Sequence, residues 1–403
     1  MNIEIRVVGP EQHAEFITPL LTAFGAPIVP ERLERSQRLA DLTHRFVACD
    51  GDAIVGGAGT FAYTMTTPGG EVPMAGLTMV GVLPTYRRRG VMSALVRRHL
   101  DEARAAGQRV SALWASEGSI YGRFGYSMAS LACHASIERE RTGFIAEVPR
   151  VGRVRLVSEE EALRVFPEVW ERVRPTTPGM LSRSPSWWQH RRIPDLEKGA
   201  PPLQRVVLEI DGRPEAYALY RHQLKWNSNN LPEGHLLVHE AMGATPLATR
   251  VIWRYLFDID LMPRIEMNLL PPDHPLIHLL REPRRLRLSV LDALWVRLID
   301  IEAALGARAF GSRDAVTIEV EDALYPANSG RYRIDGAVGL CARTDGPAGL
   351  RLDVGTLGAA WLGGFTLRRL ADAGRVEELE EGAIDRADAL FRSSRGPWCP
   401  EIF

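Results

Sequence analysis

The sequence has little cysteine, almost no lysine and no long apolar run. Its four cysteines, Cys49, Cys133, Cys341 and Cys399, are far apart and form no C-x-x-C pair, so neither a disulfide framework nor a zinc site is expected. A run of about 18 apolar residues, the length of a membrane span, does not occur, and the N-terminus lacks the pattern of a secretory signal. These absences predict a cytoplasmic protein with reduced thiols, no membrane span and no metal.

An excess of charge of one sign is also absent. The 49 basic and 50 acidic residues give a formal net charge of -1, which provides no overall attraction to nucleic acid or to an anionic membrane. Nearly all basic residues are arginine, since Lys198 and Lys225 are the only lysines. With 45% hydrophobic and 25% charged residues, the composition is typical of a globular protein, and 403 residues predict two or three domains.

Three segments differ in their pattern. Residues 1–150 alternate strands and helices in an α/β order, with a helix that crosses over after a central strand. Residues 151–290 repeat one strand–turn–helix unit of this plan without its basic cluster, which indicates a degenerate second copy; an unrelated α/β segment is the alternative. Residues 291–403 form an α+β pattern in which the acidic stretch 375–391 is expected to be helical.

The most informative motif joins an apolar strand to an amphipathic helix. After the expected strand Leu77–Leu83 come Arg87, Arg88, Arg89 and Gly90, and then the helix begins. A helix N-terminus offers unpaired N–H groups and the positive end of a dipole, and glycine lets an anion approach the backbone. The motif therefore predicts a pyrophosphate site, in an order that resembles acyl-CoA acetyltransferases.

A solvated basic patch is the alternative interpretation of the three arginines. Their position between a buried strand and a helix favours the anion site. Other phosphate motifs, G-x-x-x-x-G-K-[ST] and a helix-opening G-x-G-x-x-G, do not occur.

Transfer of an acyl group from a thioester needs a proton donor for the departing sulfur. Tyr121, on a short helix after the expected strand Val110–Trp114, fits this role. A phenol with a pKa of about 10 is protonated at neutral pH. The alternative is that Tyr121, like Tyr126, only packs in the core.

Several segments together resemble the Eis-type (enhanced intracellular survival) N-acetyltransferases of the GNAT superfamily. They are the Tyr86–Gly90 cluster, the segment Trp114–Tyr126 and the terminal phenylalanine. The resemblance implies a catalytic GNAT domain (1–150), a degenerate GNAT-like domain (151–290) and a sterol-carrier-protein-like domain (291–403) whose tail reaches the active site. It also implies a homohexamer.

The resemblance further implies a reaction and its participants. Acetyl-CoA would donate an acetyl group to primary amines of aminoglycoside-like polyamines, without a metal. Protein lysines are an alternative acceptor, and a non-enzymatic protein that binds lipids or partners through its C-terminal domain is the alternative of a different class.

The resemblance also assigns roles to single residues. It makes Tyr121 the general acid and the carboxylate of Phe403 the general base. The residues that it places against acetyl-CoA are Val80, Gly81, Val82, Arg87, Arg88, Arg89, Gly90, Val91, Met92, Ser93, Ser116 and Glu117. Family members can carry an acidic residue just before the terminal phenylalanine; here that residue is Ile402, and Glu401, one place earlier, is the expected substrate contact.

Overall fold

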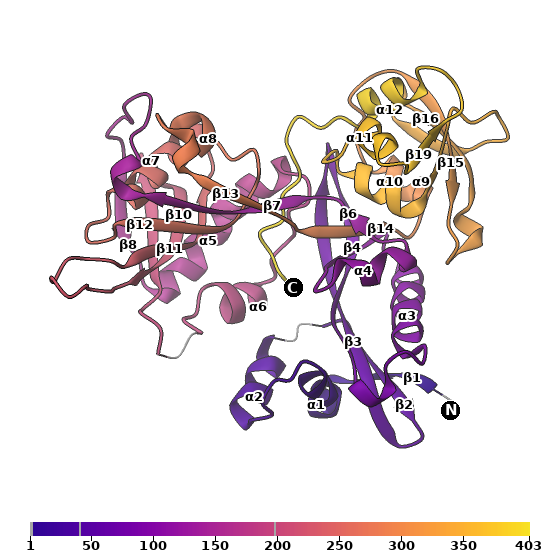
Figure 1. Cartoon of the computed structure of the whole chain (residues 1–403), viewed down its shortest axis with the longest axis horizontal. Coiled ribbons are helices and arrows are strands. Elements are labelled where there is room, and N and C mark those ends of the chain that lie inside the picture. The colour runs from indigo at the N-terminus through magenta and orange to yellow at the C-terminus, as the bar shows by residue number, and fades with distance from the viewer. Residues whose placement is uncertain (1–2, 40–41, 197–198) are drawn as a thin grey trace.

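The computed structural model describes residues 3–39, 42–196 and 199–403. These residues form three β-sheets, two of seven strands and one of five, and each sheet is the centre of a separate lobe (Figure 1). Helices cover both faces of the first two sheets. The third sheet and its helices are formed by the C-terminal part of the chain. The predicted order of two α/β units followed by an α+β unit is confirmed.

The first sheet has the strand order β1-β2-β3-β4-β5-β14-β6. The bounds of these strands are Ile3–Val8 (β1), His44–Asp50 (β2), Ala53–Thr67 (β3), Gly70–Val82 (β4), Val110–Trp114 (β5), Leu294–Leu298 (β14) and Ser127–Met128 (β6). Helix α1 (His13–Ala23), followed by α2 (Pro30–Leu39), packs on one face of the sheet. Helix α3 (Val91–Ala105) buries its apolar side against the other face.

The second sheet repeats this plan, with the strand order β13-β7-β12-β11-β10-β9-β8. Its strands are Arg287–Asp292 (β13), Leu131–Glu138 (β7), Arg264–Leu270 (β12), His235–Gly243 (β11), Arg213–Gln223 (β10), Gln204–Ile210 (β9) and Arg153–Leu156 (β8). Helix α5 (Glu159–Val173) covers one face and α7 (Pro246–Asp258) the other. Because α7 joins the parallel strands β11 and β12 as α3 joins β4 and β5, the unit is a second copy of the first.

Two strands do not belong to the sheet that the expected segment boundaries give them. Strand β7 lies in the expected first segment but pairs with β12 and β13 of the second sheet. Strand β14 lies in the expected third segment but is inserted between β5 and β6 of the first sheet. Both strands cross the junction between the lobes in Figure 1. The second sheet is thus built from the consecutive strands β7 to β13, whereas the first sheet is completed by β14, which follows all of them in the sequence and so couples the two lobes.

The third sheet has the order β17-β16-β15-β18-β19. Its strands are Leu340–Arg343 (β17), Gly330–Asp335 (β16), Ala315–Glu321 (β15), Leu350–Asp353 (β18) and Val376–Glu378 (β19). The remaining helices are α4 (Gly118–Tyr121), α6 (Pro185–Trp187), α8 (Leu276–Leu279), α9 (Ile301–Gly306), α10 (Val354–Trp361), α11 (Leu367–Asp372) and α12 (Ala383–Phe391). The expectation of a helix throughout 375–391 is wrong at its start, because β19 pairs there with β18 and Gly382, at φ 76°, separates it from α12.

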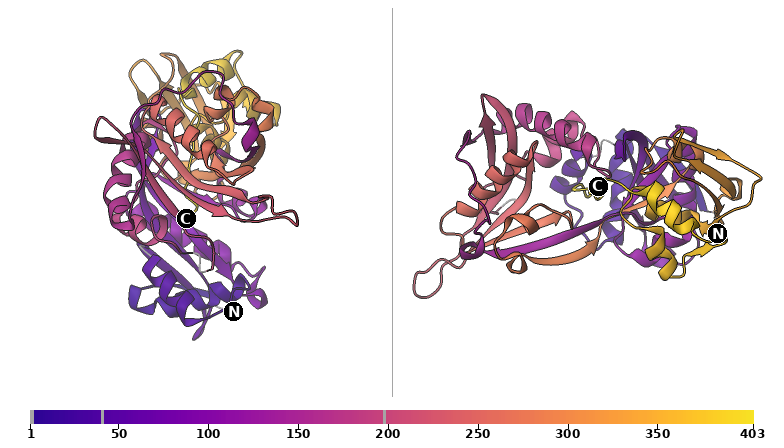
Figure 2. Two further views of the ribbon diagram at one scale, coloured as in Figure 1. Left: turned by 90° about the vertical axis from the view of Figure 1, so that its left-hand side faces the viewer. Right: turned by 90° about the horizontal axis from the view of Figure 1, so that it is seen from above.

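The end of the chain leaves the third lobe and returns to the other two. After α12 the tail runs to the junction of the first and second lobes, where the C-terminus lies in Figure 1 and in both views of Figure 2. The last residue is thereby placed beside strands more than three hundred positions earlier in the sequence.

Candidate active site

An opening in the first sheet lies between β4 and β5. The two strands pair in parallel only where Met74–Gly76 of β4 lie opposite Val110–Ala112 of β5. Strand β4 then continues to Val82 alongside β3, with an irregularity in its pairing and with Met79 at φ 52°. The backbone of β4 beyond Gly76 therefore no longer pairs with β5 and is available to an extended ligand.

A cavity of about 850 Å³ lies along this opening. It is lined by most of the residues predicted to contact acetyl-CoA, namely Val80, Gly81, Val82, Arg87, Arg88, Gly90, Val91, Met92, Ser93, Ser116 and Glu117, and by the predicted acid Tyr121. Arg89 does not line it, and its guanidinium instead lies 5.4 Å from the centre of the Tyr86 ring. The sequence pattern could not separate Arg89 from its neighbours, because the direction of each side chain depends on the turn.

The turn before α3 leaves donors free for an anion. Gly90 is the N-cap residue at φ 81°, and no side chain caps the helix. The first N–H groups of α3 consequently have no partner within the helix, and they line the cavity from Val91 to Ser93. Arg88, at φ 60°, adds a second left-handed residue to the turn. This arrangement fits the pyrophosphate of coenzyme A.

Two of the predicted contacts also have structural roles. The guanidinium of Arg87 donates to the carbonyl of Ala23, at 3.2 Å, and so ties the turn to the end of α1. A Cβ on Gly81 would lie 2.9 Å from Cδ2 of Leu20. The absence of a side chain at Gly81 therefore permits α1 to pack closely on β4 in addition to any contact with a ligand.

Tyr121 is held beside the cavity in its protonated form. Its side chain is 6% exposed, and burial, together with the charge of Glu117, raises its pKa to about 12. The helix α4 that carries it starts at Gly118 after Glu117. A phenol in this state can give a proton to a thiolate at neutral pH but does not lose one spontaneously.

Tyr126, the neighbouring tyrosine, belongs to a buried network of hydrogen bonds. Its hydroxyl is 2.7 Å from Ser111 Oγ, which is 2.8 Å from His99 Nε2, and His99 Nδ1 is 2.7 Å from Thr60 Oγ1. Burial lowers the pKa of His99 to about 3, so the imidazole is neutral. The sequence did not predict this network of hydrogen bonds. Its only sign in the sequence is a polar residue, His99, on the apolar side of α3. The network holds Tyr126 in place, whereas Tyr121 faces the cavity.

Phe403 lies at the point where β4 and β5 diverge. Its side chain is 9% exposed, and its ring centre is 5.3 Å from that of Tyr63 on β3. A Cβ on Gly76, in the last paired position of β4, would lie 3.0 Å from Cε2 of Phe403. The last residue therefore occupies the space that a side chain at position 76 would fill.

The structure corrects the expectation for Glu401. Its side chain is 3% exposed and lies among basic residues, with Arg183 as its closest ionic partner and Arg192 at 3.2 Å. The indole of Trp187 donates to the other carboxylate oxygen at 3.0 Å. Both oxygens are thus engaged within the protein, and Glu401 anchors the tail instead of facing a substrate.

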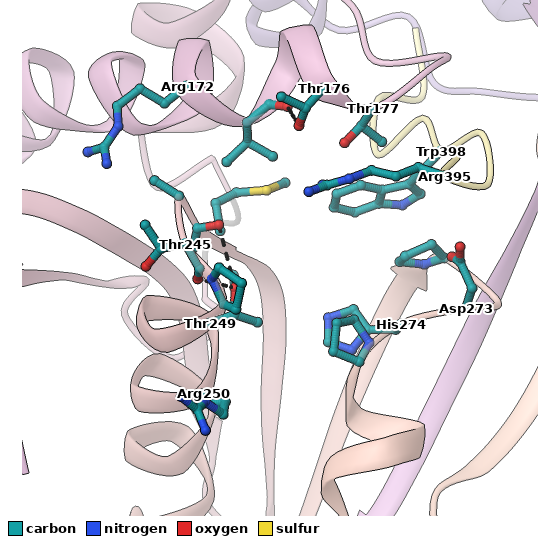
Figure 3. Close-up of a pocket in the computed structure, with 18 of the residues that line it drawn as sticks. Arg172, Thr176, Thr177, Thr245, Thr249, Arg250, Asp273, His274, Arg395 and Trp398 are labelled. Atoms are coloured by element: carbon teal, nitrogen blue, oxygen red, sulfur yellow. Dashed lines mark hydrogen bonds between the residues drawn. The ribbon is translucent and has the colours of Figure 1, made fainter. Parts of the chain in front are cut away.

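The equivalent site of the second lobe is modified. Thr245 caps α7 by accepting from the N–H of Ala248 at 3.1 Å, and Pro246 has no N–H to offer. The free donors that characterise the start of α3 are therefore reduced. A cavity of about 420 Å³ remains here, with Thr245 and Thr249 on one side and Trp398 and Arg395 from the tail on the other (Figure 3). The loss of the anion site predicted for this copy agrees with the capped helix.

Neither a membrane span nor a metal centre is found in the part of the chain that the structure describes. None of the helices there is long and apolar enough to cross a bilayer. In the same ranges, no group of three or more histidine, cysteine or acidic side chains could hold a metal ion.

Comparison with known proteins defines the class of the chain. Residues 4–129 and residues 179–298 each match a model of an acetyltransferase (GNAT) domain, and residues 301–400 match a sterol carrier protein domain. An uncharacterized N-acetyltransferase of Streptomyces avermitilis is 39% identical over 100% of both chains. The chain is therefore an acetyl-CoA-dependent N-acetyltransferase with two GNAT domains followed by a sterol-carrier domain.

More specific relatives identify the family. The N-acetyltransferase Eis of Mycobacterium tuberculosis is 34% identical over 85% of this chain and 84% of the relative. The crystal structure of Eis1 from Mycobacterium abscessus superposes with a TM-score of 0.88 at 32% identity, over 100% of both chains. The chain belongs to the Eis-type N-acetyltransferases of the GNAT superfamily.

Proposed function

We propose that this protein acetylates primary amines of aminoglycoside-like polyamines, with Tyr121 as the general acid and the carboxylate of Phe403 as the general base. The observation that carries the proposal is the position of these residues on opposite faces of one opening. Tyr121 belongs to the hydrophobic cluster on the α3 face of β4, which includes Ala75 and Leu77, whereas Phe403 belongs to the cluster on the other face, which includes Met74. A thioester in the opening would lie between them.

The proposed reaction is a direct transfer. The amine nitrogen attacks the thioester carbonyl carbon, a C–N bond forms and the C–S bond breaks. Tyr121 gives its hydroxyl proton to the departing sulfur, which leaves as the thiol of coenzyme A. The nitrogen becomes acidic as its new bond forms, so a weak base such as the Phe403 carboxylate can accept its proton. Protons returned through solvent restore both residues.

The acceptor class is supported by the family and by the surroundings of Phe403. The carboxylate of the last residue lies at the junction of two lobes, and a negative group there favours the approach of a cationic amine. The same argument applies to a lysine side chain, which makes protein-lysine acetylation the second candidate. Assembly as homohexamers, a cytoplasmic location and the domain boundaries at 150 and 290 also remain predictions of the resemblance.

The proposal is tested by measuring thiol release from acetyl-CoA with a panel of amines. The panel contains aminoglycosides, linear polyamines and lysine peptides, and mass spectrometry counts the acetyl groups on each product. We expect turnover with aminoglycosides, a large loss with Tyr121→Phe and a comparable loss when one residue is added after Phe403. Faster turnover with lysine peptides than with any polyamine would favour the second candidate, and full activity of the extended protein would exclude Phe403 as the base.

A further inference from the structure

The tail connects the strand openings of the two GNAT domains. Phe403 lies beside Gly76, where β4 and β5 diverge. In the second sheet, β11 and β12 pair in parallel only where His235–Val238 of β11 lie opposite Arg264–Met267 of β12. Beyond these residues the two strands diverge in the same way. Trp398 reaches this second opening, where its indole donates to the carbonyl of Leu269 at 2.6 Å.

Tail residues occupy the opening of the second domain. The space between the ends of β11 and β12 is small, about 20 Å³, and Trp398 and Pro400 form part of its wall. Trp398 also borders the neighbouring cavity of about 420 Å³ at the start of α7. The backbone N–H of Trp398 donates to the carbonyl of Pro178 at 2.8 Å. Gly179 is at φ 87°, and a Cβ there would lie 3.1 Å from the carbonyl oxygen of Trp398. The described residues that line the corresponding cavity of the first domain, about 850 Å³, include none from the tail.

The charged groups around Glu401 come from the second domain. Arg183 pairs with Glu401 and also with Glu240, on the diverged part of β11, at 2.6 Å. The side chain of Arg183 is fully buried, and its guanidinium lies 3.4 Å and 4.5 Å from the ring centres of Trp170 and Trp188.

Arg192 adds a second positive charge to this network. It bonds to Glu240 at 2.9 Å, to Glu401 at 3.2 Å and to the carbonyl of Pro400 at 3.1 Å. The two arginines and two glutamates balance in charge. Loss of the Glu401 charge would therefore leave an uncompensated cation in a buried position, which is unfavourable.

We infer that the second GNAT domain is an intramolecular receptor for the tail. It binds the tail residues from Trp398 to Glu401 in the opening between β11 and β12 and with Arg183 and Arg192. It thereby positions Phe403 in the first domain. The catalytic part of this inference rests on the proposed role of Phe403. Glu401, Arg183 and Arg192 are then positioning residues, because they act through the last two residues of the chain. The inference gives the degenerate copy a function, since the opening between β11 and β12 holds the chain's own end.

The inference is tested with the full-length protein by digestion with a carboxypeptidase under native conditions. Release of Phe403 and Ile402, followed by mass spectrometry, reports how often the tail leaves its groove. We expect Glu401→Gln to speed release by about 10²-fold, because one partner of a buried pair is removed, and to lower kcat while KM for acetyl-CoA stays unchanged. Glu381→Gln, at an exposed glutamate, is the matched control and should behave like the wild type.

A second variant keeps the test decisive if Glu401→Gln does not fold. Trp398→Phe retains the ring and the charges but loses the hydrogen bond to Leu269, and it should speed release by about tenfold. Release at the wild-type rate in the folded variants would overturn the inference. Rapid release with an unchanged kcat would instead support the receptor and refute Phe403 as the base.

Discussion

Replacing Gly76 by alanine tests whether the position of Phe403 limits acetyl transfer. The added Cβ would lie 2.9 Å from Cε2 of Tyr63 and 3.0 Å from Cε2 of Phe403, where ordinary contacts are 3.4–4 Å. At least one ring must therefore move by about 0.5 Å, since the neighbouring atom on each side is part of a rigid ring. Overpacking of this kind destabilises a core by about 1–3 kcal/mol.

The expected catalytic effect follows from this displacement. A misplacement of about 1 Å can lower a rate 10²-fold, so a shift of half this size should lower kcat roughly tenfold. KM for acetyl-CoA should stay the same, because the turn at Gly90 and the start of α3 line the cavity, whereas Gly76 and Phe403 do not. Thiol release at saturating acetyl-CoA measures both constants, and thermal unfolding measures the stability.

Gly306→Ala is the control for this experiment, because a Cβ at that position meets nothing within 4 Å. It should leave kcat at the wild-type value. A folded Gly76→Ala variant with wild-type kcat would refute the reasoning, since the ring of Phe403 could then move without consequence for transfer.

Three further predictions concern the acid, the anion site and the buried charges. Tyr121→Phe should lower kcat by about 10²–10⁴-fold while calorimetry finds unchanged binding of acetyl-CoA. Gly90→Ala places a side chain at φ 81° without a steric contact, in the turn that lines the cavity, so it should raise KM for acetyl-CoA. Gly374→Ala is strained in the same way at φ 74° and should lower stability only. Burial of Glu240 opposes ionisation, but the charges of Arg183 and Arg192 and the hydrogen bonds from Arg183 and Tyr217 together outweigh it, and the pKa falls from 4.5 to about 2. A lowered carboxyl pKa stabilises the fold above pH 4.5, and this contribution is lost as the pH falls toward 2. Urea unfolding across this range should show a shallower pH dependence for Glu240→Gln, and an unchanged slope would contradict the assignment.

The local features of the turn before α3 could be predicted, because they are specified by residues that are neighbours in the sequence. An apolar strand, a turn containing Gly90 and an amphipathic helix specify an uncapped helix start without any distant contact. The short helix with Tyr121 follows from the same argument. Only the turn itself decided that Arg89 lies over Tyr86 and does not line the cavity, because a backbone with two left-handed residues directs successive side chains differently.

The sheets that β7 and β14 join could not be predicted in this way. The periodicity of β7 and of β14 identifies strands but contains no information on their partners, since any sheet with a free edge accepts an apolar strand. The same limit applies to Glu401. Its partners Arg183 and Arg192 lie about two hundred positions away, and nothing beside them in the sequence marks them as a pair with the tail.

The sequence by itself determined the family, the three-part order and the turn with an uncapped helix start at Gly90, because short segments specify secondary structure and its termini. Only the tertiary structure decided that Phe403 lies beside Gly76, that Glu401 is a buried anchor and that the second domain holds the tail. The physical reason is that the contacts of a chain end depend on long-range packing and charge balance, and these arise only when separate segments meet in the folded protein.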